Sequence, residues 1–339
     1  MADQLKLIAV EPLYALPGAE IIIECTGFRI TDGDDGCFVA GSQCRIIAAS
    51  STRIMASVPH DAAGRCPMQL VSGGTGSNTI EITIGREIAS DMHLVANPAV
   101  DPSDDSIILT RSGSRGQQLP ATLFRLEPDG FLDEFPEAIL NPTGIAFDGH
   151  AQMFVTNRAE GEVYAVSRDG LATVFASGLG VATGIAFDSE GGMYVGDRSG
   201  TIYRIREFGE SETFTVLEPS VAAFHMAFGP DNRLYVTAPG LASHDCVHVI
   251  DAEGFDTKFF EGLGRPQGLA FDRDGHLYVA ACYQGRHGIV RISADGSSAE
   301  RLVAGNNIVG LCFNRKGEMI VATGDRVYSI DCSIKGILL

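Results

Sequence analysis

The sequence Pro142-Thr-Gly-Ile-Ala-Phe-Asp148, followed by Met153-Phe-Val-Thr156 and Val163-Tyr-Ala-Val166, decides the fold because the chain repeats it. Four later copies of its first segment begin at Ala182, Ala223, Pro266 and Ile308. The phenylalanines of this segment are 40, 41, 43 and 42 residues apart, at Phe147, Phe187, Phe228, Phe271 and Phe313. A weaker copy at Ala96–Asp101 precedes them, so the repeat region holds six units.

Each unit has the pattern of four short strands. An apolar strand meets a tight turn such as Asp272-Arg-Asp-Gly, a second and an alternating third strand follow, and an outer strand such as Thr173-Val-Phe-Ala ends the unit. Four strands in about 40 residues form the blade of a β-propeller, which avoids open sheet edges by radial repetition. The sequence therefore predicts an all-β fold with a six-bladed β-propeller over residues 93–339.

Residues 1–85 lack this repeat. Their apolar runs are separated by turn residues and show no helical period; the runs are Leu5–Val10, Glu20–Cys25, Cys44–Ile47, Arg53–Val58, Met68–Val71 and Thr79–Ile84. This pattern predicts a small antiparallel sandwich. Residues 86–92 are predicted to be a linker or a closing strand of the propeller. We expect a modest interface, more polar than a core, so that a propeller beginning at Arg86 folds without the sandwich.

Composition and charge exclude several classes of partner. The 339 residues carry a net charge of −18, which repels polyanions and excludes nucleic-acid binding. No run approaches the roughly 18 consecutive apolar residues of a spanning helix, so no membrane insertion is expected. The N-terminus has no signal-peptide pattern, and the eight cysteines are dispersed. These features predict a cytoplasmic protein, or an exported one if a signal peptide has been removed.

The inner strands of a propeller line its central channel, so the residues at their starts are candidate site residues. Asn97 and His225 stand where other units have the repeat glycine, and they are three blades apart, on opposite sides of the channel. We predict this pair as catalytic if the protein is an enzyme, with His225 as base. The alternative is that His225 only fills a divergent blade. One residue earlier, we expect a polar, ligand-binding wall of Thr143, Thr183 and Gln267.

The loops that leave the second strands supply a further set of candidate ligand-binding residues: Arg111, Asn157, Arg158, Asp197, Arg198, His244 and Tyr283. The three arginines lie on adjacent blades and could clamp a carboxylate or phosphate. The alternative is that they pair with local acidic groups and solvate the rim.

No motif predicts a metal or another cofactor. The sequence His244-Asp-Cys-Val-His248 has alternating metal-ligand types, but His248 aligns with aromatic packing positions of other units. Same-face residues on a strand are also roughly 6.5–7 Å apart, too far to converge easily on one ion. Neither a nucleophile elbow, a zincin helix nor a phosphate-binding glycine loop is present in the sequence.

The repeat units resemble the NHL-repeat and gluconolactonase group of six-bladed propellers, whose motif runs P-x-G-I-A-x-D-x-x-G-x-(I/L)-Y-V. The resemblance implies the fold. It does not select a function, because such blades serve lactonases, lyases and binding scaffolds alike. Gluconolactonases hold a divalent metal with a Glu, Asn and Asp set. At the corresponding positions this chain has Gln267, Phe224, Thr143 and Thr183, so metal-dependent lactonase activity is not expected.

The first 85 residues resemble a TIG (IPT) immunoglobulin-like domain. The residues that carry the resemblance are Val10-Glu-Pro12, Gly18-Ala-Glu-Ile-Ile-Ile, Thr26-Gly-Phe28, Ser51-Thr-Arg-Ile54, Val58-Pro59 and Asn78. Such domains are usually spacers or recognition modules.

The leading functional hypothesis is a recognition propeller that binds a small polar or anionic molecule, or a protein segment, at the channel mouth. The alternative is a gluconolactonase-like hydrolase or lyase that acts in the central channel without the usual metal ligands.

Overall fold

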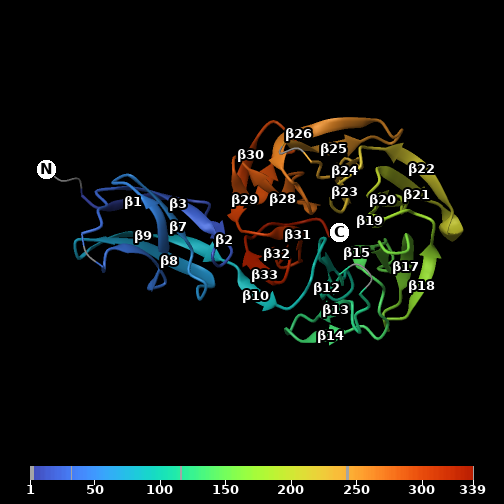
Figure 1. Ribbon diagram of the computed structural model, residues 1–339, viewed down its shortest axis with the longest axis horizontal. Coiled ribbons are helices and arrows are strands. Elements are labelled where there is room, and N and C mark those ends of the chain that lie inside the picture. Colours follow the sequence, from blue (N-terminus) through green and yellow to red (C-terminus); the bar gives the residue numbers. More distant parts are fainter. Residues whose placement is uncertain (1–3, 32, 115–116, 242–243, 339) are drawn as a thin grey trace.

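A computed structural model describes residues 4–31, 33–114, 117–241 and 244–338. It shows an N-terminal sandwich beside a ring of six four-stranded blades (Figure 1). The predicted all-β architecture, an immunoglobulin-like sandwich joined to a six-bladed propeller, is confirmed. The single helical turn among the described residues is η1 (Glu207–Gly209), and no described helix is long and apolar enough to cross a membrane.

The sandwich has two sheets. One has the order β1 (Lys6–Glu11), β3 (Glu20–Thr26), β7 (Arg53–Ser57), β6 (Arg45–Ala49). The other has the order β2 (Tyr14–Ala15), β9 (Thr75–Ile84), β8 (Gly64–Ser72), β4 (Gly36–Val39), β5 (Ser42–Gln43). Alternating residues fill the space between the sheets because successive side chains on a strand face opposite ways. Ile21, Ile23, Ile54, Met68 and Ile82 are all buried there.

The blades follow one another around the ring, and the first-named strand of each blade lies at the channel. Blade 1 consists of β11 (Ala99–Val100), β12 (Ile107–Thr110), β13 (Leu123–Leu126) and β14 (Leu132–Glu134). Blade 2 consists of β15 (Pro142–Phe147), β16 (Met153–Asn157), β17 (Glu162–Val166) and β18 (Ala172–Ala176). Blade 3 consists of β19 (Ala182–Phe187), β20 (Met193–Asp197), β21 (Thr201–Ile205) and β22 (Ser211–Val216).

Blade 4 consists of β23 (His225–Phe228), β24 (Leu234–Thr237), β25 (Asp245–Ile250) and β26 (Asp256–Gly264). Blade 5 consists of β27 (Leu269–Phe271), β28 (Leu277–Tyr283), β29 (Arg286–Ile292) and β30 (Ala299–Ala304). Blade 6 consists of β31 (Ile308–Phe313), β32 (Glu318–Thr323), β33 (Val327–Asp331) and β10 (Arg86–Ala89). The outer strand of blade 6 thus comes from the segment that follows the sandwich.

The two ends of the ring differ in the connections they carry. At the turn end, tight turns join each inner strand to the second strand. At the loop end, the chain enters each inner strand and leaves each second strand. The turns share one device: the side chain of Asp148, Asp188 or Asp272 accepts backbone N–H groups two and four residues further along the chain. This Asx-type bonding explains why the repeat ends in Asp.

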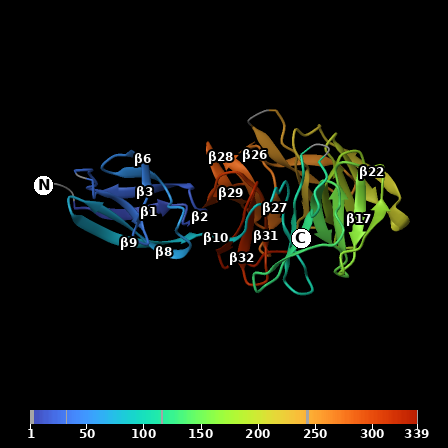
Figure 2. The same cartoon turned by 60° about the horizontal axis from the view of Figure 1, so that its bottom comes forward.

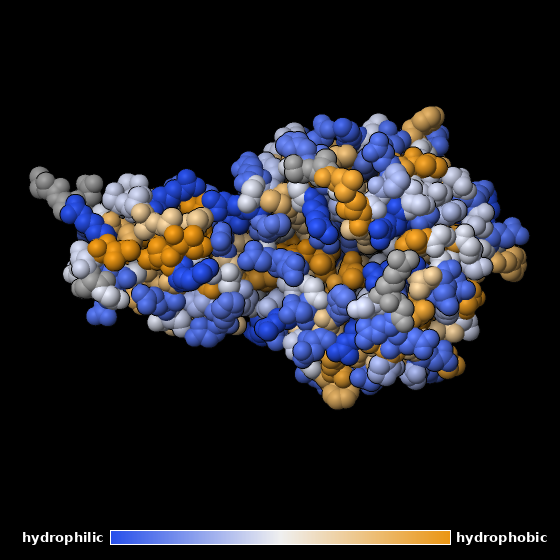
Figure 3. All heavy atoms as spheres, in the orientation of Figure 1, coloured by the Kyte–Doolittle hydropathy of each residue, from blue (hydrophilic) through white to orange (hydrophobic). Residues whose placement is uncertain are grey.

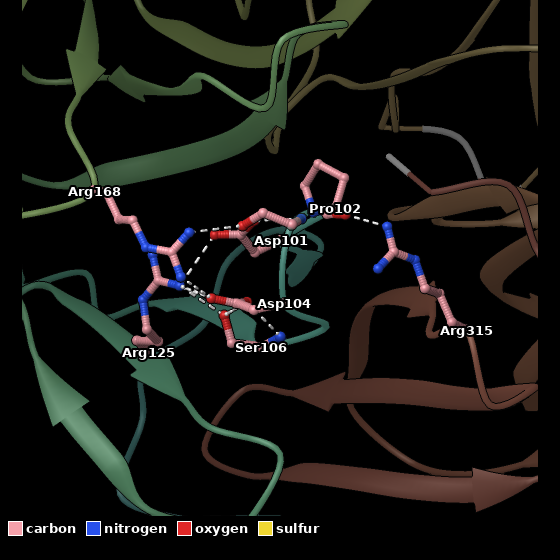
Figure 4. Close-up of polar contacts among 8 residues, drawn as sticks. Asp101, Pro102, Asp104, Ser106, Arg125, Arg168 and Arg315 are labelled. Carbon is pink, nitrogen blue, oxygen red and sulfur yellow. Dashed lines mark hydrogen bonds and ion pairs between the residues drawn. The ribbon is translucent and has the colours of Figure 1, made fainter.

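An ion-pair network fixes blade 1 to its neighbours at the turn end (Figure 4). Arg125 of β13 contacts Asp101 at 3.0 Å and Asp104 at 3.1 Å. Arg168 of blade 2 reaches Asp104 at 2.8 Å, and Arg315 of blade 6 donates to the carbonyl of Pro102. The network therefore ties three consecutive blades together where the ring closes.

The C-terminal segment runs to the centre of the ring (Figure 1). Gly336 pairs with Asp272 in an isolated bridge, and the N–H of Ile337 donates to the carbonyl of Phe271 at 2.8 Å. These bonds hold Ile337 and Leu338 against the inner strands at the turn end.

The sandwich and the propeller meet at a junction in which a strand of one pairs with a strand of the other (Figure 2). Strand β2 lies parallel between β30 of blade 5 and β9 of the sandwich, so one sheet continues across the junction. Leu16 is buried in a core cluster with Ile289, Val303 and Tyr328 of the propeller. Beside this apolar contact lies a cavity of about 400 Å³ whose lining includes Arg65 and Glu81 of the sandwich and Asp331 of the propeller, so the junction has both an apolar and a polar part.

Candidate functional site

The central channel contains a cavity of about 340 Å³. Its walls come from the inner strands β15, β19 and β23 and from the C-terminal segment. The lining is mainly apolar and includes Ile185, Phe187, Met226, Phe228 and Ile337. The cavity extends from the start of the inner strands to the turns after them, where Ser189, Pro230 and Asn232 are exposed, so it opens at the turn end.

His225 is the first residue of β23 and lines this cavity. Its side chain is 4% exposed, and its Nε2 atom has no hydrogen-bond partner. Burial lowers the pKa of the imidazole to about 4, because the charged form loses its hydration. His225 is therefore neutral at neutral pH, with free hydrogen-bonding capacity.

Asn97 also lines the cavity, but both ends of its amide are occupied. Its Nδ2 donates to the carbonyl of Leu269 at 2.9 Å, and its Oδ1 accepts the N–H of Leu311 at 3.1 Å. Asn97 thus links the inner strands of blades 5 and 6. The structure brings Asn97 and His225 to one cavity but gives them different bonding roles.

The expected polar wall is only partly present in this cavity. Thr183 lines it, but the Thr183 hydroxyl donates to the carbonyl of Gly196 and accepts the N–H of Phe224. Thr143 is fully buried behind the lining, with its hydroxyl 3.5 Å from the carbonyl of Asn141. Gln267 lines a separate cavity at the loop end. The two threonine hydroxyls bond to backbone groups of the protein, so they do not form the ligand-binding wall that the sequence predicted.

The three arginines that were predicted to bind an anion all direct their guanidinium groups at backbone carbonyls. Arg111 donates to Asp91, Arg158 approaches Gly113 at 3.5 Å, and Arg198 donates to Ser220 at 3.2 Å. None of the three forms an ion pair with a carboxylate in the described part of the chain. Burial, and then repulsion from Arg198, lower the pKa of Arg158.

The other loop-end candidates have mainly structural surroundings. Asn157 accepts the N–H of Ala159, and Asp197 accepts the N–H groups of Val181 and Ser199, so both shape their own loops. His244 is exposed, and the ring of Tyr283 packs 6.1 Å from that of Phe260. The structure does not gather these residues, or the three arginines, around the central cavity.

Sequence reasoning missed the apolar lining of the cavity. Phe187 and Phe228 are the motif phenylalanines of the repeat, whose spacing indicated the repeat period alone. Their position near the end of an inner strand was a usable signal. Ile337 gave no such signal, because it reaches the channel only through the path of the C-terminal segment.

One group of described residues has the spacing of metal ligands. The ligand atoms of Asp272, Asp274 and His276 lie within 4.8 Å of one another, in the turn of blade 5. The Asp272 carboxylate, however, already accepts two backbone N–H groups and contacts the His276 ring and the Tyr278 hydroxyl. The same turn bonding occurs in blades whose turns have no histidine at this position, such as blade 3. The group is therefore accounted for by the turn.

Comparisons with known proteins agree with the fold. Solved structures resemble the chain at 12–15% identity, which supports the fold alone. A proposed gluconolactonase has a TM-score of 0.62 at 15% identity, over 75% of this chain and 94% of that one. An auxiliary nutrient binding protein from Bacteroides ovatus has a TM-score of 0.56 at 12% identity, over 97% and 98%.

A catalytically inactive virginiamycin B lyase from Staphylococcus aureus, with quinupristin, has a TM-score of 0.53 at 15% identity, over 92% of this chain and 99% of that one. A search of the curated proteins finds no match. The family model of the IPT/TIG domain matches residues 6–84, which are the two sheets of the sandwich. The chain therefore consists of an IPT/TIG domain, at residues 6–84, followed by a six-bladed β-propeller whose fold is similar to that of the gluconolactonase-like structure.

Proposed function

We propose that the protein binds a small molecule in its central cavity. The ligand has an apolar body and one polar group that hydrogen-bonds His225. The observation that carries this proposal is a buried imidazole, lining a cavity that opens to solvent, whose Nε2 has no partner. A buried polar group without a partner costs about 1–3 kcal/mol, so a ligand gains that interaction once a rotation of the ring turns Nε2 towards the cavity.

The lining determines the ligand class. Phe187, Phe228 and Ile337 offer apolar surface, so the body of the ligand is apolar. The imidazole is neutral, so a neutral partner such as a hydroxyl group fits better than a cation or an anion. This differs from the polar or anionic ligand that the sequence led us to expect.

Binding is favoured over hydrolysis or lyase chemistry. An imidazole with a pKa of about 4 is a weak base at neutral pH. The one carboxylate in the described lining is that of Asp188, and its Oδ1 accepts the turn N–H groups of Glu190 and Gly192. The nutrient-binding description of one structural neighbour supports the same assignment.

Two matched probes test the proposal: 2-naphthol, which has a hydroxyl group, and 2-methoxynaphthalene, in which that donor is methylated. Dissociation constants for both are measured by calorimetry on the wild type, on His225→Phe and on the exposed control His244→Phe. We expect the wild type to bind naphthol more tightly than methoxynaphthalene. In His225→Phe the ratio of the two dissociation constants should shrink about fivefold, which corresponds to one hydrogen bond. Failure of both probes to bind, or an unchanged preference in His225→Phe, would contradict the proposal.

A further inference from the structure

A second cavity, of about 500 Å³, lies at the loop end between blades 5 and 6. It is separate from the central cavity, which opens at the turn end. Its polar lining side chains are Arg265, Gln267, His287, Asn306 and Asn307. They come from the loop before β27, the start of β29 and the loop before β31, so three separate segments of the chain build the cavity.

The five side chains share one property. None of them donates or accepts a side-chain hydrogen bond, or forms an ion pair, with another residue in the described ranges. Their backbone is nevertheless held in place: the carbonyl of Gln267 accepts the Thr237 hydroxyl at 2.5 Å, and the N–H of Arg265 donates to Asp245 at 3.2 Å. The cavity thus presents free polar groups on a fixed frame.

The guanidinium of Arg265 forms no ion pair in the described part of the chain, although the Asp245 carboxylate accepts the backbone N–H of the same residue. Arg265 also lines an adjoining cavity of about 380 Å³, together with His287. Arg301 lies nearby and donates to the carbonyl of His287 at 3.5 Å. The pKa of Arg301 is lowered by burial and then by repulsion from Arg286, while Glu20 and Glu11 of the sandwich oppose this.

The side-chain chemistry selects an acceptor-rich ligand. A guanidinium supplies five N–H donors and no acceptor, whereas each amide supplies two donors and a carbonyl oxygen with two lone pairs, so the excess of donors comes from the arginine. Donors therefore outnumber acceptors, and the arginine adds a charge suited to planar or tetrahedral oxyanions. The chain as a whole carries −18, which opposes an anion everywhere on its surface, so binding here depends on the local donors of the cavity.

We propose that this loop-end cavity is a second ligand site, which takes a small oxyanion, either a carboxylate or a phosphate. Arg265 binds the charged oxygens, and the amides of Gln267 and Asn307 bind the remaining polar groups. This site is separate from the central cavity, because the two cavities share no lining residue.

The test is a calorimetric titration of the full-length protein with citrate and, separately, with inorganic phosphate, at constant ionic strength set by sodium chloride. The variants are Arg265→Gln, which removes the charge, and Gln267→Leu, which removes an amide without changing charge. The matched control is Arg198→Gln, since Arg198 also lies at the loop end without a carboxylate partner but lines neither cavity.

We expect saturable one-to-one binding of at least one of the two anions. Arg265→Gln weakens it tenfold or more, Gln267→Leu about fivefold, and Arg198→Gln leaves it unchanged. Binding of citrate would identify the ligand class as a carboxylate, and binding of inorganic phosphate would identify it as a phosphate. Absence of saturable binding for both anions, or an equal loss in Arg198→Gln, would overturn the proposal. Neither result affects the naphthol experiment.

Discussion

The turn end of the propeller and the loop-end cavity between blades 5 and 6 differ in how their polar side chains are bonded. At the turn end, Asp272 accepts four hydrogen bonds, and Nη1 of Arg125 contacts two carboxylates and a hydroxyl, so both groups have several protein partners. At the loop end, Arg265 and Asn307 line a cavity and bond to no described side chain. Polar side chains thus stabilise the fold at the turn end, whereas those that line the cavity between blades 5 and 6 have no described side-chain partner.

This difference teaches that hydrogen-bond occupancy, more than residue type, separates structural from binding groups. His225 is the third case, since it is buried like Asp272 but has a free Nε2. Removing a group with several protein partners costs stability, because its former partners are left buried and unbonded. Removing a group without a protein partner should lower only the affinity for a ligand that bonds to it.

The largest effect is expected for Arg125→Ala. The Arg125 side chain is 12% exposed and that of Asp101 is 6% exposed, so the substitution leaves a nearly buried carboxylate without its cation. We expect the free energy of unfolding to fall by about 3 kcal/mol or more, measured by denaturant unfolding. Arg168→Ala is the control, because that side chain is 68% exposed and its loss should cost under about 1 kcal/mol. Equal losses of unfolding free energy in Arg125→Ala and Arg168→Ala would show that the buried ion pair does not stabilise the fold more than the exposed one.

The next effect is the pH dependence that His225 confers. Its pKa is about 4 in the folded protein against 6.5 for the free side chain, so the unfolded chain binds a proton first as the pH falls. Stability should therefore decrease between about pH 6.5 and pH 4, by about 3 kcal/mol in total, and His225→Phe should remove this part of the decrease. Unfolding curves across that range, for wild type and variant, measure it. Parallel pH profiles for the two proteins would show that His225 is not buried in the folded protein.

A smaller loss is expected for Asp272→Ala. The turn N–H groups of Asp274 and His276 and the hydroxyl of Tyr278 lose their acceptor, and we expect a cost of about 2 kcal/mol. The exposed neighbour substitution Asp274→Ala should cost less than about 0.5 kcal/mol. Thermal unfolding of both variants decides between a structural turn and a dispensable one.

The smallest effect is expected at the loop end. Asn306→Ala removes an exposed amide that bonds to no described side chain, and stability should stay within about 0.5 kcal/mol of the wild type. A loss comparable to that of Asp272→Ala, in the same thermal assay, would show that loop-end polar groups are also structural.

The fold could be predicted because each blade carries its own copy of the pattern. The position of His225 was predictable for a related reason: a side chain interrupts a register that other blades fill with glycine. The occupied amide of Asn97 was not predictable, because its partners Leu269 and Leu311 are far from it in the sequence. Repeats determine where a side chain lies, whereas its bonding depends on contacts between distant segments.

The sandwich shows the same limit. Its strands follow from alternating apolar residues, but the burial of Leu16 in the propeller core depends on how β2 is placed against β30. Hydrophobic atoms also gather on one outer face of the sandwich (Figure 3). Neither feature has a local sequence signal.

The central claim is that the channel cavity takes an apolar ligand with a polar group directed at His225. A crystal structure of the protein saturated with 2-naphthol tests it most directly. We expect the naphthol rings to lie between Phe187, Phe228 and Ile337, with the hydroxyl within hydrogen-bond distance of an imidazole nitrogen of His225. Naphthol bound elsewhere beside an empty channel, or bound in the channel with its hydroxyl turned away from His225, would contradict the claim.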